Sequence, residues 1–194
     1  MATTALSYHL YTLFLFTKSD LKTLVLPVVS DVCIPALFSR FSNWSHGPAL
    51  PLARQTLFAL AAAPSCSLSR LPHAFLWFWV HALQFGLANQ SHPHAIAEDT
   101  INHPYRPLPA GRISVQTVRA LRWTVVPLCL LLSAAYGPRT TLASLLGSLY
   151  MLAYNEGGGA RGHWLVRNVQ NAVGYSVAEA GTMLVACTSL SRIS

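Results

Sequence analysis

Charged side chains are scarce in this sequence. They make up 10% of its 194 residues, whereas 53% are hydrophobic, and an ordinary soluble domain is about 25% charged. This composition favours a membrane protein over a water-soluble one. The formal net charge is nevertheless +7, but the basic residues stand singly between apolar runs, as anchors at a lipid interface do. Because no basic patch could follow a phosphate backbone, we expect no nucleic-acid partner.

Closely spaced cysteines are also missing. The four cysteines stand at positions 33, 66, 129 and 187, so they form no CxxC pair and none lies at zinc-ligand spacing from a histidine. We therefore expect neither a disulfide nor a zinc site. The N-terminus lacks the basic start, apolar core and small-residue cleavage site of a secretory signal. Insertion into a membrane would then depend on later apolar segments.

Apolar segments of near-membrane length recur along the chain. Five candidates cover residues 24–38, 71–88, 113–136, 141–154 and 168–190, and none shows the alternation of a barrel strand. The sequence thus predicts an all-α transmembrane fold with about five membrane helices. If the N-terminus is cytoplasmic, eight of the thirteen Lys and Arg fall on that side. The positive-inside rule then places the loop over residues 89–122 in the cytoplasm.

Shorter signals mark where elements begin and end. Ser114 is placed to cap a helix, and Gly137 with Pro138 would end that helix. The glycines at 157–159 would close the span over 141–154. We expect an interfacial helix within residues 1–16, a polar hinge at 18–20, a short surface helix over 55–63, and interface anchors at Arg119 and Arg122.

The stretch from Asn89 to Arg112 is the polar exception between two apolar segments. Glu98 and Asp99, two of the six acidic residues, lie in it, together with three histidines and four prolines. A few residues would suffice to connect two helices. We therefore interpret this stretch as a proline-stiffened loop that forms a site.

The side chains of this stretch suit a metal–diphosphate ligand. Mg²⁺ is held in proteins by one or two carboxylates with further oxygen ligands, and the candidate donors are Asn89, Glu98, Asp99 and Asn102. Arg106 and Arg112 carry planar forks that match phosphate oxygens. Two plainer readings stay open: a solvated, capping role for the carboxylates, and anchoring at the lipid interface for the arginines.

Aromatic side chains near this stretch could line an apolar pocket. Ionisation of an allylic diphosphate leaves a carbocation, which aromatic ring faces stabilise. The candidate lining residues are Trp77, Phe78, Trp79, Phe85 and Trp123. His81, on the same segment, is more simply read as a buried histidine with its hydrogen bonds satisfied.

The polar stretch also carries a family pattern. The sequence NQ, followed by ED-x-x-N-x-P-x-RPLPAGRIS, resembles the first aspartate-rich motif of the UbiA superfamily of intramembrane prenyltransferases. It is most similar to the fungal branch that includes membrane-bound terpene cyclases. Residues 18–23, KSDLKT, and the segment from Tyr154 to Tyr175 resemble that branch as well. The resemblance implies that residues 18–190 form about the N-terminal half of a nine-helix bundle.

The resemblance also implies a function. It implies Mg²⁺-dependent chemistry on an isoprenyl diphosphate such as farnesyl diphosphate, in terpenoid secondary metabolism, by a multi-pass protein of the endoplasmic reticulum membrane. Both cyclisation and prenyl transfer fit, with cyclisation favoured by the branch. Glu98 and Asp99 are the implied catalytic residues and, with Asn89, the implied metal ligands. The implied diphosphate-binding residues are Asn89, Asn102, Arg106 and Arg112.

Three features depart from the family pattern. The second carboxylate motif is absent, the residues HPHA lengthen the spacing after Asn89, and His103 stands where the branch commonly has lysine. A shortened, non-catalytic membrane relative is therefore an alternative to an enzyme. A small transporter would show an inverted repeat, and no such repeat is visible.

Overall fold

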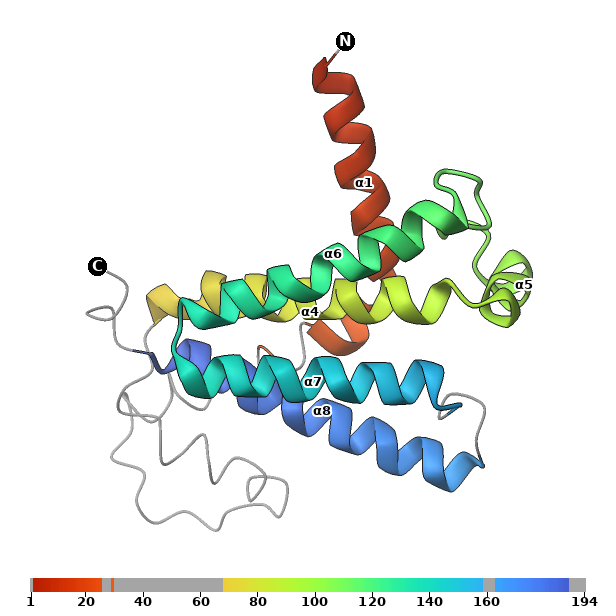
Figure 1. The fold of residues 1–194 in the computed structure, drawn as a ribbon. Helices are drawn as coiled ribbons and strands as arrows, with labels where there is room; N and C mark the ends of the chain where they lie inside the picture. The colour runs from red at the N-terminus through yellow and green to blue at the C-terminus, as the bar shows by residue number, and fades with distance from the viewer. Residues whose placement is uncertain (1, 26–28, 30–67, 159–162, 189–194) are drawn as a thin grey trace.

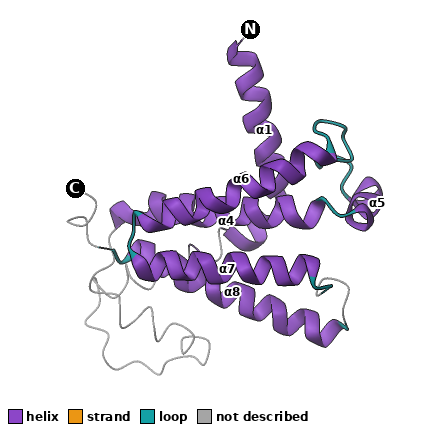
Figure 2. Ribbon diagram, in the orientation of Figure 1, coloured by secondary structure: helices purple, strands orange, loops and turns teal. Residues whose placement is uncertain are grey.

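The structure is a computed structural model, and it describes residues 2–25, 29, 68–158 and 163–188 (Figure 1). Helices make up the regular structure of these residues, with no strand among them (Figure 2). The α-helices are α1 (Ala2–Asp20), α4 (Leu71–Gln90), α5 (Pro93–Asn102), α6 (Val115–Ala134), α7 (Pro138–Glu156) and α8 (Trp164–Ala186). A π-helical turn, Leu21–Val25, extends α1, and a 3₁₀ turn, Leu68–Arg70, precedes α4. The all-α prediction is confirmed for the described part of the chain.

Four of these helices form an up-down-up-down bundle. α4 packs against α6 and α8, and α7 packs against the same two helices, so neighbours run antiparallel (Figure 1). Short connections favour this arrangement for α6, α7 and α8, whereas α5 lies within the longer connection from α4 to α6. The bundle therefore has one end where α4 and α7 finish, where α6 and α8 begin, and where α5 lies. We call this the polar end.

α1 stands apart from the bundle. Its C-terminal part packs against α4, whereas its N-terminus projects well away from the other helices (Figure 1). The helix runs without a break through Lys18, Ser19 and Asp20, so the hinge predicted there is wrong. The buried neighbours Phe16 and Thr17 explain the difference, because tertiary packing holds the polar turn in the helix.

Local signals fix the ends of α6 as the sequence predicts. The Ser114 side chain accepts a hydrogen bond from the Thr117 backbone N–H at 3.1 Å, which is the expected N-cap. Gly137 follows the helix with φ of 111°, a conformation that costs glycine little. By contrast, α7 and α8 both begin earlier than the predicted spans, at Pro138 and Trp164.

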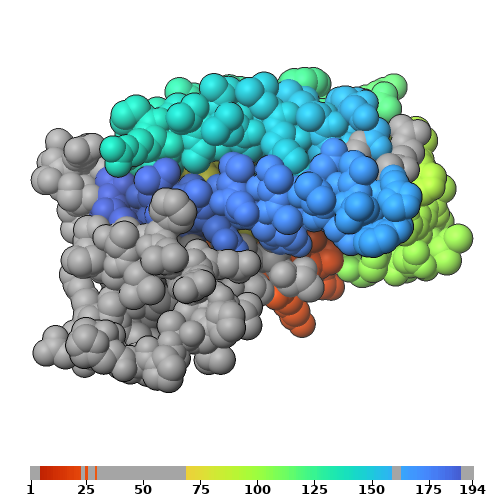
Figure 3. Space-filling view, turned by 90° about the horizontal axis from the view of Figure 1, so that it is seen from below, coloured from red at the N-terminus to blue at the C-terminus, as the bar shows by residue number. Residues whose placement is uncertain are grey.

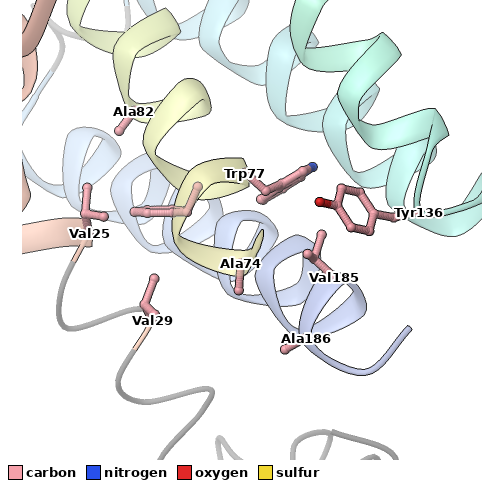
Figure 4. Packing of buried hydrophobic residues seen from close by; sticks show 9 residues of the cluster. Val25, Val29, Ala74, Trp77, Ala82, Tyr136, Val185 and Ala186 are labelled. Carbon is pink, nitrogen blue, oxygen red and sulfur yellow. The ribbon is translucent and has the colours of Figure 1, made fainter. Parts of the chain in front are cut away.

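The bundle core is built around Trp77 of α4. Its side chain is 2% exposed, and its indole N–H donates to the Ser133 hydroxyl of α6 at 2.8 Å. Tyr136, Val185 and Ala74 lie around it (Figure 4). α8 reaches this ring through Gly181, where any Cβ would overlap the indole.

The described helices differ in whether they are long and apolar enough to cross a membrane. α6 is the one described helix that is long and apolar enough to cross a membrane, with a mean hydropathy of 1.3 over its best window. The predicted spans at 71–88, 141–154 and 168–190 are helical as α4, α7 and α8, the last of them as far as Ala186. Most of the predicted span at 24–38 lies outside the described residues. The predicted helix at 55–63 lies wholly outside them.

The cysteine prediction needs one correction. Cys187 is disulfide-bonded, whereas Cys129 is a buried free thiol. Spacing along a sequence does not report distances in the folded chain, which is why the pattern gave no sign of this bond.

Candidate functional site

The stretch from Asn89 to Arg112 is not a single loop. α4 continues to Gln90, α5 begins at Pro93, and the turns that lead to α6 start only at His103. Proline suits the first turn of a helix, because the N–H that it lacks has no partner there. Pro93 therefore starts a helix here, and the loop prediction is wrong for residues 93–102.

α5 separates the two adjacent carboxylates. Asp99 is 4% exposed, whereas Glu98 is exposed to solvent, because neighbouring residues on a helix point about 100° apart. Asn102 is also exposed, and Asn89 is half-buried near the end of α4. Of the two predicted carboxylates, only Asp99 thus lies inside the molecule.

Asp99 forms an ion pair with Arg106. The guanidinium Nη1 lies 2.6 Å from Asp99 Oδ1, and Nη2 donates to the Ser19 hydroxyl at 3.2 Å. Asp99 Oδ2 and Arg106 Nε are buried without a hydrogen-bond partner. A buried acceptor and a buried donor of the same ion pair thus remain without partners, an arrangement that costs free energy unless another group satisfies them.

The second predicted arginine contacts α1 instead. Arg112 Nε donates to the Thr12 hydroxyl at 3.2 Å, and its guanidinium lies 4.2 Å from the Tyr8 ring centre and 5.2 Å from that of Tyr11. The Tyr8 hydroxyl in turn donates to the Arg112 carbonyl. The structure therefore uses Arg112 to hold α1, and brings Asp99 and Arg106 together without it.

The last turn of α1 reaches the same place, and sequence reasoning missed it. The Ser19 hydroxyl accepts a hydrogen bond from Arg106. The Lys18 ammonium lies 4.7 Å from the ring centre of Tyr105. Burial raises the pKa of Asp20, and the positive charge of Arg106 opposes that rise. The available signal was three consecutive polar residues in an otherwise apolar helix, which were interpreted as a hinge.

A second ion pair joins α6 to α7 at the polar end. Arg122 Nη1 lies 2.6 Å from Glu156 Oε1, and the hydrogen bond from Arg122 lowers the pKa of Glu156. The positive charges of His92 and Arg119 act in the same direction. Arg122 is only 7% exposed, so it differs from the lipid-interface anchor that was predicted.

An aromatic cavity of about 310 Å³ lies between α4, α7 and α8. In the view from below, α8 lies at the front of the bundle beside α7, with α5 at the end where α8 begins (Figure 3). Phe78, Phe85, Tyr150, Tyr154, Tyr175 and Trp77 supply its aromatic wall. Trp79 instead bonds Thr17, and Trp123 is 57% exposed, so neither of these predicted lining residues is part of it.

The cavity and the polar end share one face of α4. Phe78, Ala82 and Phe85 line the cavity, and Asn89 follows Phe85 by four residues, so it continues the same stripe one turn further. Phe85 also contacts Tyr154 of α7, with ring centres 6.0 Å apart. α4 therefore leads from an apolar cavity toward the polar end.

His81 lies in the cavity wall with both ring nitrogens engaged. Nδ1 lies 2.7 Å from the Trp77 carbonyl oxygen and Nε2 lies 2.7 Å from the Ser144 hydroxyl. Because a carbonyl only accepts, Nδ1 carries the proton and Nε2 accepts from the serine. The interpretation of His81 as a satisfied buried histidine is confirmed.

The described residues gather no group of three or more His, Cys, Asp or Glu side chains that could hold a metal by themselves. A hard cation at Asp99 would thus depend on amide, hydroxyl or ligand oxygens for its remaining coordination. Phosphate oxygens commonly complete a Mg²⁺ site in this way.

Comparison with known proteins places this arrangement in context. The model of the UbiA prenyltransferase family matches residues 49–192. The chain is 31% identical over 176 residues to fumagillin beta-trans-bergamotene synthase from Aspergillus fumigatus, covering 91% of this chain and 50% of that protein. It is 33% identical over 167 residues to somaliensene A/B synthase from Streptomyces somaliensis, covering 81% of this chain and 52% of that protein. The chain thus spans about half the length of these curated relatives, and no solved structure matches it.

Proposed function

Because the chain belongs to the UbiA prenyltransferase family, we propose that it performs Mg²⁺-dependent chemistry on an isoprenyl diphosphate such as farnesyl diphosphate. Its relatives are named as synthases of bergamotene and of somaliensene, which favours terpene cyclisation over prenyl transfer to an acceptor. The proposal draws on family membership for the reaction class and on the polar end for the residues.

Two buried polar atoms without partners indicate which atoms would contact the ligand. Asp99 keeps a buried oxygen without a donor, and its partner Arg106 keeps a buried N–H without an acceptor. A cation satisfies the first and an anion satisfies the second, so a Mg²⁺–diphosphate pair fits both at once. Asn89, Glu98, Asn102 and Arg112 stay proposed metal or diphosphate ligands from the family pattern. Glu98 and Asn102 are exposed and Arg112 contacts α1, so the geometry supports Asp99 and Arg106 most directly.

The chemistry then divides between the Asp99–Arg106 pair and the aromatic cavity. As the bond between the allylic carbon and the diphosphate oxygen breaks, its electron pair stays on the oxygen, and bound Mg²⁺ would neutralise the charge that develops there. Arg106 would donate to the same phosphate oxygens. The hydrocarbon chain would lie in the aromatic cavity, where the faces of Trp77, Phe85 and Tyr154 stabilise positive charge and the apolar wall excludes water.

We also propose the domain, the membrane location and the orientation that the family resemblance implies. Residues 18–190 would form one domain of a multi-pass protein of the endoplasmic reticulum membrane, with the polar end facing the cytoplasm. The chain covers about half the length of its curated relatives. A non-catalytic membrane relative is the second candidate, because Glu98 is exposed and only Asp99 of the two adjacent carboxylates is buried.

Binding and pyrophosphate release in lipid nanodiscs separate these candidates. We expect farnesyl diphosphate to bind the wild type only with Mg²⁺ present, and pyrophosphate to be released from the bound substrate. Asp99→Asn and Arg106→Gln should each weaken binding by at least about tenfold, the size of a lost charge-assisted hydrogen bond.

Arg139→Gln is the control, because it removes one positive charge at the start of α7, at the opposite end of the bundle. Release of pyrophosphate that requires both Mg²⁺ and Asp99 would establish an enzyme. Absence of any Mg²⁺-dependent binding would refute the proposed function and leave the non-catalytic candidate.

A further inference from the structure

Arg70 is a buried cation without a hydrogen-bond partner. It lies directly before α4, and its side chain is 1% exposed. All three guanidinium nitrogens, Nε, Nη1 and Nη2, are buried and make no hydrogen bond. Neither the ion pairs nor the cation–π contacts of the described residues include Arg70. Because an arginine keeps its charge in a protein, this part of the chain buries a positive charge for which the described residues supply no paired anion.

The start of α4 makes this place still more favourable for an anion. α4 begins at the end of the bundle opposite α5 (Figure 1), and the N-terminal end of a helix carries a partial positive charge. A cation is unfavourable there, whereas an anion is stabilised. The last carbonyls of α6 and α8 lie at the same end of the bundle, yet none of them accepts a hydrogen bond from Arg70.

The hydrogen bond of His73 shows which way this face of α4 points. Arg70 precedes His73 by three residues and has helical backbone angles (φ −89°, ψ −9°), so both side chains lie on the same face of the helix. His73 Nδ1 lies 2.9 Å from the hydroxyl of Tyr136, just after α6. The Arg70 face of α4 therefore points toward the end of α6. Ser69 and Pro72, on either side of this residue, are exposed, so a ligand can approach from the end of the bundle.

We propose that Arg70 binds a phosphate group, at the end of the bundle opposite the Asp99–Arg106 pair. A guanidinium donates two parallel hydrogen bonds to phosphate oxygens, and the three unpartnered nitrogens of Arg70 allow this geometry. The 20 residues of α4 span about 30 Å, the thickness of the hydrocarbon core of a membrane. The phosphate therefore comes either from a lipid headgroup at that surface or from free phosphate in solution. This inference goes beyond the proposed function, and its tests contain neither Mg²⁺ nor an isoprenyl diphosphate.

Titration of the full chain with dioctanoyl phosphatidic acid, in phosphate-free micelles, tests the site. Native mass spectrometry counts the lipid molecules bound per chain. We expect the wild type to bind one molecule, and Arg70→Gln to bind it about tenfold or more weakly, the size of a lost charge-assisted hydrogen bond. Arg139→Gln is the matched control and should leave the affinity unchanged, because Arg139 is exposed in the first turn of α7 at the same end. Equal affinities in wild type and Arg70→Gln, or equal losses in both variants, would overturn the proposal.

Two further titrations distinguish the sources of the phosphate. Inorganic phosphate offers the oxygens without acyl chains, and dioctanoylglycerol offers the chains without the phosphate. Tighter binding of phosphatidic acid than of inorganic phosphate would identify a lipid headgroup, and equal or weaker binding would identify free phosphate. Either result supports the site if the binding requires Arg70. Binding of dioctanoylglycerol as tight as that of phosphatidic acid would overturn the proposal, because the phosphate would then contribute nothing.

Thermal unfolding separates a ligand site from a purely structural role of Arg70. Arg70→Met replaces the charge by an apolar side chain. Without phosphate, we expect this variant to be at least as stable as the wild type, because it removes an unpaired buried charge. Phosphatidic acid at about a hundredfold its dissociation constant should raise the unfolding midpoint of the wild type by about 5 °C or more and leave that of Arg70→Met unchanged. A variant that is less stable than the wild type by the same amount with and without the lipid would show a structural role and overturn the proposal.

Discussion

Two ion pairs at the polar end have the same length and different surroundings. Arg106–Asp99 and Arg122–Glu156 both measure 2.6 Å. The Asp99 side chain is 6% exposed, whereas that of Glu156 is 55% exposed. The buried carboxylate keeps an oxygen without a donor, and water can reach the exposed one. Equal length therefore does not imply equal function: the first pair is the one that we propose binds a ligand, and the second joins α6 to α7.

The largest effect should follow from breaking the buried pair. Arg106→Leu leaves the Asp99 carboxylate buried without its counter-charge, which costs about 3–5 kcal/mol. The free energy of unfolding, measured by denaturant titration in micelles, should fall by that order. Glu98→Gln on the exposed face of the same helix is the control, with a change below about 0.5 kcal/mol. Similar values for the two variants would show that Asp99 is not buried as described.

A smaller effect should follow from breaking the exposed pair. Glu156→Gln keeps a hydrogen-bond acceptor for Arg122 but removes its charge, so the loss of unfolding free energy should be about 1 kcal/mol. The same denaturant titration measures it. A loss as large as that of Arg106→Leu would show that the two pairs contribute equally to the free energy of unfolding.

The smallest effect is a pH dependence that belongs to the exposed pair. The folded pKa of Glu156 lies below the usual 4.5, so its contribution to stability is complete above pH 4.5 and is lost as the pH falls through the folded pKa. Wild type and Glu156→Gln should therefore converge in stability as the pH is lowered below 4.5. A difference that stays constant down to strong acid would contradict the assigned cause.

Sequence patterns were most reliable where the interactions are local. The cap at Ser114 and the glycine at 137 each lie within a few residues of the end of α6 that they mark, so the sequence predicts both ends. The contrast between Glu98 and Asp99 could not be predicted, because it depends on α5 being a helix and on its rotation. Once Pro93 is known to start a helix, the separation of the two carboxylates follows.

Long-range contacts could not be predicted from the sequence, for a different reason. Arg112 bonds Thr12 across 100 residues, and Arg106 bonds Ser19 across 87. No periodicity within either segment indicates its partner, so the participation of α1 in the site remained invisible. The same holds for the tyrosines of the cavity wall, since facing residues on α7 and α8 are decided by how the helices pack.

Gly181 gives the fold an evolutionary constraint that is separate from the reacting groups. Any side chain larger than hydrogen at this position would overlap Trp77, which also lines the cavity. A lineage that replaced this glycine would have to displace the indole or the helix, and either change reshapes the space available to a ligand. A single position that touches no ligand can therefore alter cavity shape as these proteins diverge.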